Sequence, residues 1–119
     1  MIPKRTLGNT GLEITRLGYG SIGLRGPNTC GVRVVDDEDA DKFLNLVLDS
    51  GINFIDTAPD YGASEARIGR AISSRRSEFY LATKCGCDYV QHDDHIDVVH
   101  TWTREVLERN IETSLARMQ

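Results

Sequence analysis

The clearest hydrophobic pattern in the chain is a helical repeat that begins near residue 40. Apolar residues recur there at intervals of three and four positions, which is typical of an amphipathic helix. They are Ala40, Phe43, Leu44, Val47 and Leu48. Acidic residues within 36–39 favour a helix start because they complement the positive end of the helix dipole. Gly51 is a typical residue just beyond a helix end, so the pattern predicts a helix between these two signals.

Two further segments show helical spacing after a hydroxyl residue that can cap a helix. Ser64 is expected to cap the first of them, and Thr103 the second. The apolar positions of the first are Ala66, Ile68, Ala71 and Ile72, and those of the second are Leu107, Ile111, Leu115 and Met118. We expect each apolar stripe to face the core.

Short apolar runs between these helices predict strands. Lys4–Leu7 and Leu12–Arg16 are joined by Gly8-Asn-Thr-Gly11, which is typical of a hairpin whose glycines supply positive φ. Three more strands are expected at Leu17–Ser21, Asn53–Ala58 and Phe79–Thr83. The run up to Asp56 is apolar at successive positions, as in a buried parallel strand. Residues 23–35 and the polar stretch from Cys85 to about Trp102 are predicted loops.

The resulting order is a hairpin followed by three strands that alternate with three helices. Alternation of this kind predicts an α/β fold with parallel strands and right-handed crossovers. No composition shift marks a boundary, so residues 1–119 are expected to form part of a single domain. Either a small open sheet or the start of a barrel fits this order.

Composition narrows the class of protein. Hydrophobic residues make up 39% of the chain and charged residues 27%, which favours a folded globular protein over a disordered one. A net charge of −4 gives no bulk attraction for nucleic acid. No apolar stretch approaches the ~20 residues of a membrane helix, and the N-terminus lacks the apolar core of a signal peptide. We therefore expect a cytoplasmic protein with reduced cysteines and no membrane partner.

Candidate chemistry gathers at the ends of two predicted strands. Asp56 ends the second parallel strand, Lys84 follows the third, and Tyr61 lies in the loop after Asp56. If the strands are neighbours, Asp56 and Lys84 start roughly 5 Å apart. A phenol normally has a pKa near 10, so proton transfer near neutral pH needs a nearby positive charge such as Lys84. We expect a proton-transfer site in which Asp56 holds the lysine.

A second group of residues lies in the predicted loop 86–102 and its flanks. Cys85 and Cys87 precede His92, His95 and His100, and sulfur and imidazole ligands are suited to zinc. The spacing differs from the usual pairs of closely spaced ligands. We expect no metal site here, and a metal-binding module remains an alternative.

Five segments in order resemble the aldo-keto reductase family, and together they cover essentially the whole chain. Arg5–Leu12 and Arg16–Ser21 resemble its N-terminal hairpin and first barrel strand. Asn53–Glu65 resembles the signature around its catalytic Asp and Tyr. Ala82–Gly86 resembles its lysine strand, and Thr103–Glu105 with Ile111–Met118 resembles its third helix.

The resemblance implies a (β/α)8 barrel that reduces a small aldehyde or ketone with NADPH. In that scheme Tyr61 protonates the carbonyl oxygen, Lys84 tunes Tyr61, and Asp56 anchors Lys84 and lies near the cofactor. Gly20, Ser21 and Ile22 match positions that line the nicotinamide side of the NADP site. A non-catalytic, nicotinamide-sensing subunit of the same fold is the alternative.

Two parts of the family pattern fall outside residues 1–119. The family's fourth catalytic residue is a His after the fourth strand, and His92, His95 and His100 do not match it. The loops that hold the cofactor's phosphates lie near the last strands. A full barrel takes about 250 residues, so we expect this chain to be the N-terminal part of an incomplete barrel, inactive on its own.

Overall fold

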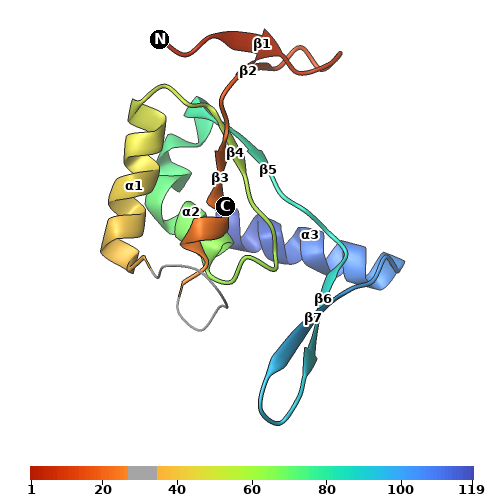
Figure 1. Cartoon of the computed structure of the whole chain (residues 1–119). Coiled ribbons are helices and arrows are strands. Elements are labelled where there is room, and N and C mark those ends of the chain that lie inside the picture. Colours follow the sequence, from red (N-terminus) through yellow and green to blue (C-terminus); the bar gives the residue numbers. More distant parts are fainter. Residues whose placement is uncertain (27–34) are drawn as a thin grey trace.

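The centre of the protein is a parallel sheet of three strands (Figure 1). The computed structural model describes residues 1–26 and 35–119. The strands are β3 (Tyr19–Gly20), β4 (Phe54–Asp56) and β5 (Tyr80–Ala82), in the order β3-β4-β5. Gly20 lies opposite Asp56, and Asp56 lies opposite Ala82. The carboxyl ends of all three strands therefore meet at one edge of the sheet.

An antiparallel hairpin lies at the other end of the sheet, where the sequence predicts one (Figure 1). Its strands are β1 (Lys4–Thr6) and β2 (Glu13–Thr15). Asn53, just before β4, connects the hairpin to the sheet. Its Oδ1 accepts from the Thr15 amide at 2.6 Å, and its Nδ2 donates to the Glu13 carbonyl at 2.9 Å.

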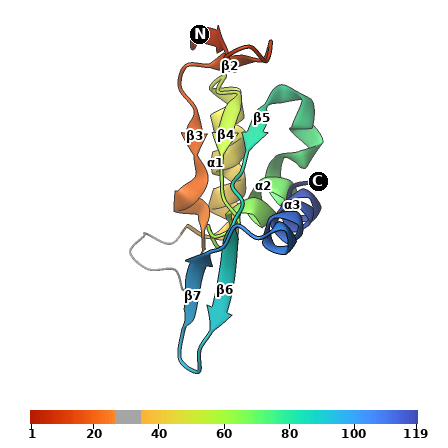
Figure 2. The ribbon, with the colours of Figure 1, turned by 90° about the vertical axis from the view of Figure 1, so that its right-hand side faces the viewer.

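Helices α1 (Asp37–Asp49) and α2 (Ser64–Ile72) lie against one face of the sheet (Figure 2). Asp36 caps α1 by accepting from the Asp39 amide at 2.8 Å. Short 3-10 helices follow β3 and α2, namely η1 (Ser21–Leu24) and η2 (Ser73–Glu78). The core between sheet and helices consists of Leu24, Ala40, Leu44, Leu48, Ile55, Ile68, Ile72 and Phe79. Most of the loop predicted over 23–35 lies outside the described residues.

Ser64 does not cap α2 as predicted. It is the first residue of α2, and Ala63 occupies the cap position without a side-chain hydrogen bond. The Ser64 hydroxyl is fully buried and lies 2.8 Å from Ser21 Oγ and 3.2 Å from Thr57 Oγ1. These buried partners, supplied by other elements, draw the hydroxyl away from the backbone of its own helix.

The polar stretch after β5 is a second antiparallel hairpin, so the loop prediction was wrong there. Strands β6 (Cys87–Gln91) and β7 (Ile96–His100) extend away from the sheet (Figure 2). The His92 amide donates to the His95 carbonyl at 2.8 Å and closes the turn between them. Among the described residues, the strands of this ribbon pair only with each other and their outer edges face solvent, so they lack the apolar alternation that would have revealed them.

Helix α3 (Arg104–Met118) begins at its predicted cap, since Thr103 Oγ1 accepts from the Val106 amide at 3.4 Å. Its buried stripe differs from the prediction. The buried positions are Val106, Asn110, Ser114 and Met118, whereas Ile111 and Leu115 are 52% and 68% exposed. The reason is close packing of α3 on α2, where a Cβ added at Gly69 would overlap the Arg117 carbonyl. Ser114 bonds to Glu65 of α2 in that contact, whereas Asn110 is buried against the backbone of Gly86 and Cys87.

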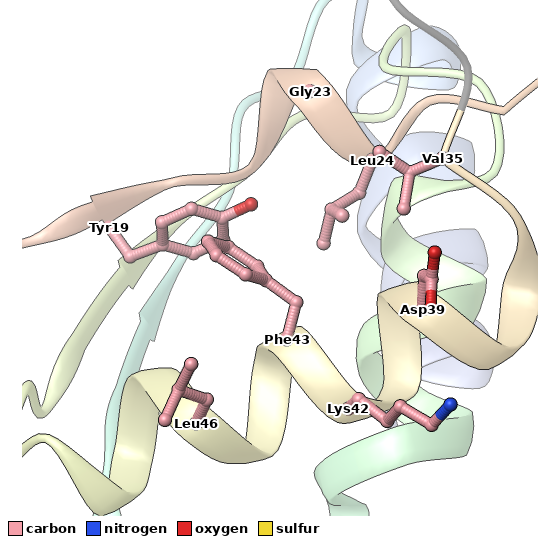
Figure 3. Close-up of a pocket in the computed structure, with 8 residues that line it drawn as sticks. All are labelled: Tyr19, Gly23, Leu24, Val35, Asp39, Lys42, Phe43 and Leu46. Carbon is pink, nitrogen blue, oxygen red and sulfur yellow. The ribbon is translucent and has the colours of Figure 1, made fainter.

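An apolar pocket of about 510 Å³ lies between β3 and α1 (Figure 3). The Tyr19 and Phe43 rings meet there edge to face, with centroids 5.3 Å apart, and Leu46 extends the wall. Burial raises the pKa of the Tyr19 phenol. Phe43, predicted as a core position of α1, is 42% exposed at this pocket. Within the described residues β3 pairs with β4 alone, so the pocket follows an open edge of the sheet.

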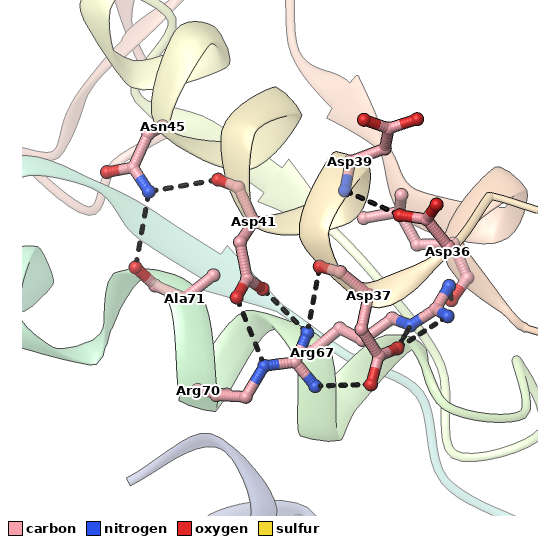
Figure 4. Close-up of polar contacts among 9 residues, drawn as sticks. Asp36, Asp37, Asp39, Asp41, Asn45, Arg67, Arg70 and Ala71 are labelled. Carbon is pink, nitrogen blue, oxygen red and sulfur yellow. Dashed lines mark hydrogen bonds and ion pairs between the residues drawn. The ribbon is translucent and has the colours of Figure 1, made fainter.

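Ion pairs join α1 to α2 on the surface of the helical layer (Figure 4). Arg67 has a side chain only 3% exposed, and it donates to Asp37 at 2.9 Å and to the Leu24 carbonyl at 3.1 Å. Arg70 adds contacts to Asp37 and to Asp41. The hydrogen bond from Arg67 lowers the pKa of the Asp37 carboxyl. Within the described residues, each helix is too short or too polar to span a lipid bilayer.

Candidate active site

Lys84 lies at the carboxyl edge of the sheet and makes two polar contacts across β4. Its Nζ donates to Asp56 Oδ2 at 2.7 Å and to the Thr57 carbonyl at 2.9 Å. The Lys84 and Asp56 side chains are 44% and 45% exposed, so the pair is open to solvent. The structure thus brings together the two strand ends, as their predicted order requires.

Tyr61 lies beside this ion pair. The Lys84 ammonium is 5.0 Å from the centroid of the Tyr61 ring, within the range of a cation–π contact. Backbone hydrogen bonds on both sides of Tyr61 fix the turn that carries it. The Tyr61 amide donates to the Ala58 carbonyl at 3.1 Å, and the Tyr61 carbonyl accepts from the Ser64 amide at 2.9 Å. The predicted trio therefore forms one cluster.

Gly62 shows why the chain after Tyr61 takes this course. Its φ is +51°, and a Cβ there would collide with the backbone of Arg25. The Ala63 amide donates to the Arg25 carbonyl at 2.9 Å. A glycine at this position lets the loop after β4 approach the end of η1, and that approach fixes the backbone next to Tyr61.

The charge of Lys84 is favoured by its neighbours. Partial burial is the largest influence on its pKa and lowers it, but the hydrogen bond and charge of Asp56, with a smaller contribution from Tyr61, raise the pKa overall. Lys84 is therefore protonated at neutral pH, and a positive charge is held beside the Tyr61 phenol.

The predicted cofactor-contacting residues differ in accessibility. Gly20 is exposed and lies opposite Asp56 in the register of the sheet. Ile22 is 44% exposed, whereas Ser21 is fully buried with its hydroxyl against Ser64. Gly20 and Ile22 thus present surface near the carboxyl edge, and the Ser21 side chain points into the protein.

Sequence reasoning missed two groups that support this cluster. One is the Thr57 carbonyl, which accepts from Lys84. The other is Glu65, a fully buried carboxylate on α2. Its Oε1 accepts from Thr83 Oγ1 and from Ser114 Oγ, each at 2.7 Å, and its Oε2 lies 3.1 Å from Arg117. Because Thr83 precedes Lys84, this carboxylate holds the end of β5, and no local pattern distinguishes it from an ordinary acid in a first helical turn.

Comparison with known proteins gives consistent matches across the chain. The model of the aldo/keto reductase family matches residues 16–119. L-galactose dehydrogenase from Arabidopsis thaliana is 34% identical over 126 residues, which cover 99% of this chain and 35% of that protein. The chain thus spans about a third of the length of the curated relatives it matches.

Solved structures show the same similarity in three dimensions. A putative aldo-keto reductase from Pseudomonas aeruginosa superposes with a TM-score of 0.80 at 36% identity, covering 97% of this chain and 42% of that one. The holo form of an aldo-keto reductase from Bacillus halodurans gives a TM-score of 0.82 at 30% identity. That match covers 100% of this chain and 37% of the Bacillus halodurans protein.

Proposed function

Because the chain belongs to the aldo/keto reductase family, we propose that the full-length protein reduces a small aldehyde or ketone to an alcohol with NADPH. The observation that carries the proposal is the position of the Lys84 ammonium, which is bonded to Asp56 and 5.0 Å from the Tyr61 ring. A phenol beside a fixed cation is suited to giving a proton to an oxygen on which negative charge develops.

Each member of the trio has a distinct role in this proposal. Tyr61 donates its hydroxyl proton to the carbonyl oxygen. Lys84 stabilises the phenolate that remains, and its raised pKa keeps it charged for this task. Asp56 positions the ammonium through the 2.7 Å contact. The hydrogen bond to the Thr57 carbonyl restricts the ammonium further.

The exposed surface around Asp56 fits the nicotinamide end of NADP. Lys84 contacts Oδ2 of Asp56, and the carboxylate is 45% exposed, so Oδ1 can accept a hydrogen bond from a sugar hydroxyl. Gly20 is exposed next to Asp56 in register, and a Cβ there would meet no atom within 4 Å. Ser21 would contribute through its backbone, and Ile22 through apolar contact. The bound cofactor supplies the hydride for the carbonyl carbon.

We also propose that residues 1–119 form the N-terminal hairpin and the first three βα units of a (β/α)8 barrel. Support comes from the parallel order β3-β4-β5 and from apolar surface along both outer strands. The proposed cofactor phosphate sites lie on later strands. For that reason we expect a polypeptide of residues 1–119 alone to show no turnover.

The test is NADPH oxidation by the purified full-length protein against a panel of small aldehydes. We expect Tyr61→Phe to lower kcat about 10²- to 10⁴-fold, the usual contribution of a positioned acid, while NADPH still binds. Tyr80→Phe is the matched control, because Tyr80 begins β5 at the opposite end of the sheet, and it should leave the rate unchanged. An equal effect of both substitutions would contradict the proposed role of Tyr61.

The same assay distinguishes a reductase from the non-catalytic alternative. Binding of NADPH without turnover of any aldehyde would favour a nicotinamide-sensing subunit. The relatives do not favour that alternative, since their names are those of reductases and dehydrogenases.

A further inference from the structure

The root of the β6–β7 hairpin brings a thiol and an imidazole together. Cys87 begins β6 and His100 ends β7, and the two are direct partners in the antiparallel register. Direct partners project their side chains from the same face of a ribbon, with Cβ atoms about 5 Å apart. Residues 13 positions apart in the sequence thus become neighbours through pairing that the sequence pattern did not predict.

A carboxylate from a different element completes the cluster. Asp60 lies in the loop after β4, and its carboxylate lies near the Cys87 thiol. One ligand atom from each of Asp60, Cys87 and His100 lies within 4.8 Å of the other two. Cys87 is only 3% exposed, Asp60 is half-buried and His100 is exposed. The cluster is therefore buried at Cys87 and open to solvent at His100, where an ion can enter.

The backbone of Cys87 is fixed before any ion binds. Asn110 on α3 accepts from the amides of Gly86 and Cys87, both at 2.9 Å, and donates to the Cys87 carbonyl at 2.9 Å. The Asn110 side chain is itself buried. Three hydrogen bonds from one side chain hold the strand end in place, which reduces the ordering cost of binding a ligand at Cys87.

We propose that Asp60, Cys87 and His100 form a zinc site at the root of the β6–β7 hairpin. Thiolate, imidazole and carboxylate are the three protein ligand types that zinc uses, and a site with three protein ligands keeps a fourth position for water. On binding, the Cys87 thiol becomes a thiolate ligand of the metal and its proton passes to solvent. The proposal departs from the sequence-based expectation of no metal.

The other candidate cluster is less suited to zinc. His92, His95 and Asp97 lie at the tip of the hairpin, and all three are exposed. The two rings stack with centroids 4.5 Å apart, and His92 Nε2 lies 3.3 Å from Asp97. This group has no thiolate and no buried member, so it serves as an internal control.

Zinc at the hairpin root would join two separate parts of the chain. The hairpin contributes two ligands and the loop after β4 contributes the third. Asp60 directly precedes Tyr61, so the ion would anchor the β6–β7 hairpin beside the proposed active site. The role of the metal is to hold the hairpin at this rim.

The test is titration of the reduced, metal-free full-length protein with Co²⁺, which reports thiolate ligation by a near-ultraviolet charge-transfer band. We expect one equivalent to bind, with the band lost in Cys87→Ser and in His100→Ala. Zinc should displace Co²⁺ from the same site. Asp60→Asn should weaken zinc binding at least about tenfold in chelator competition, since its carboxylate is a direct ligand.

Control variants make the result specific to this cluster. Cys85→Ser and the tip variant His92→Ala/His95→Ala should retain the band and the affinity. If Cys87→Ser fails to fold, His100→Ala is the decisive variant, because His100 is exposed and its loss leaves the core intact. A band that survives His100→Ala, a band lost with Cys85, or no stoichiometric binding by the parent protein would overturn the proposal.

Discussion

The contacts of the single residue Lys84 give its charge a measurable effect on the stability of the fold. Its pKa is raised above the ordinary value, because Asp56 and Tyr61 together outweigh partial burial. A group whose folded pKa is raised stabilises the fold below its unfolded pKa of about 10.4, and this contribution is lost as the pH rises through the folded value. The pair is almost half exposed, so we expect less than about 1 kcal/mol.

This expectation is tested by urea unfolding of the parent protein and of Lys84→Met between pH 7 and pH 12. The parent should be more stable at pH 7 to 10, and the difference should shrink above that range. Lys42→Met is the control, since Lys42 pairs with Glu38 on the exposed side of α1. A difference that grows with pH would contradict the assigned contacts.

The individual site residues could be predicted only where the chain itself marks strand ends. Asp56 and Lys84 each follow an apolar run, so strand order was enough to place them together. Glu65, Asp60 and the Thr57 carbonyl carry no such signal. Glu65 bonds to Ser114 of α3, Asp60 lies near Cys87 of β6, and the Thr57 carbonyl accepts from Lys84, so only long-range packing brings these groups together.

Glu65 connects three secondary-structure elements, and its negative charge stabilises their packing. Its oxygens accept from Thr83 after β5 and from Ser114 and Arg117 on α3. In Glu65→Gln, an amide oxygen that keeps the bonds from Thr83 and Ser114 turns the amide NH₂ toward Arg117, which can only donate. Leaving buried donors unsatisfied costs about 1–3 kcal/mol each, so we expect a loss of about 2–3 kcal/mol in the free energy of unfolding.

Chemical denaturation of the full-length protein measures this loss. Glu105→Gln is the matched control, because Glu105 is exposed in the first turn of α3, and it should change stability by less than about 0.5 kcal/mol. Equal stability of the two variants would mean that the carboxylate does not connect these elements in solution.

Elements with a strong period or a clear cap were predictable from the sequence. The N-terminal hairpin, α1 and the three parallel strands lie where the pattern indicates. The β6–β7 hairpin was missed because its strands are exposed and need no apolar face. The stripe of α3 was misplaced because backbone contact at Gly69, rather than hydrophobicity, selects the side that faces α2.

At the scale of the whole molecule, apolar residues lie along both outer strands of the sheet. Tyr19 and Phe43 line the pocket beside β3. On the other side, Ile111 and Leu115 lie beside Leu81 of β5 and are exposed in residues 1–119. In the barrel proposed above, elements after β5 would cover these apolar residues, which the described chain leaves exposed.

Leu115→Glu in the full-length protein tests this continuation. If later elements cover Leu115, loss of a buried leucine should cost about 2 kcal/mol or more in unfolding free energy. Ala116→Glu, on the adjacent exposed position of α3, should stay within about 0.5 kcal/mol of the parent. Two equally mild effects would argue against a barrel that covers this face.

The proposed reaction is hydride transfer from NADPH to a carbonyl carbon, with Tyr61 as the proton donor. The most direct measurement uses NADPH deuterated at the transferring position and follows the alcohol product by mass spectrometry. We expect one deuterium on the former carbonyl carbon with the full-length parent protein, and loss of that product at matched times with Tyr61→Phe. Unlabelled alcohol from the parent, or labelled alcohol formed at the parental rate by Tyr61→Phe, would contradict the proposed reaction.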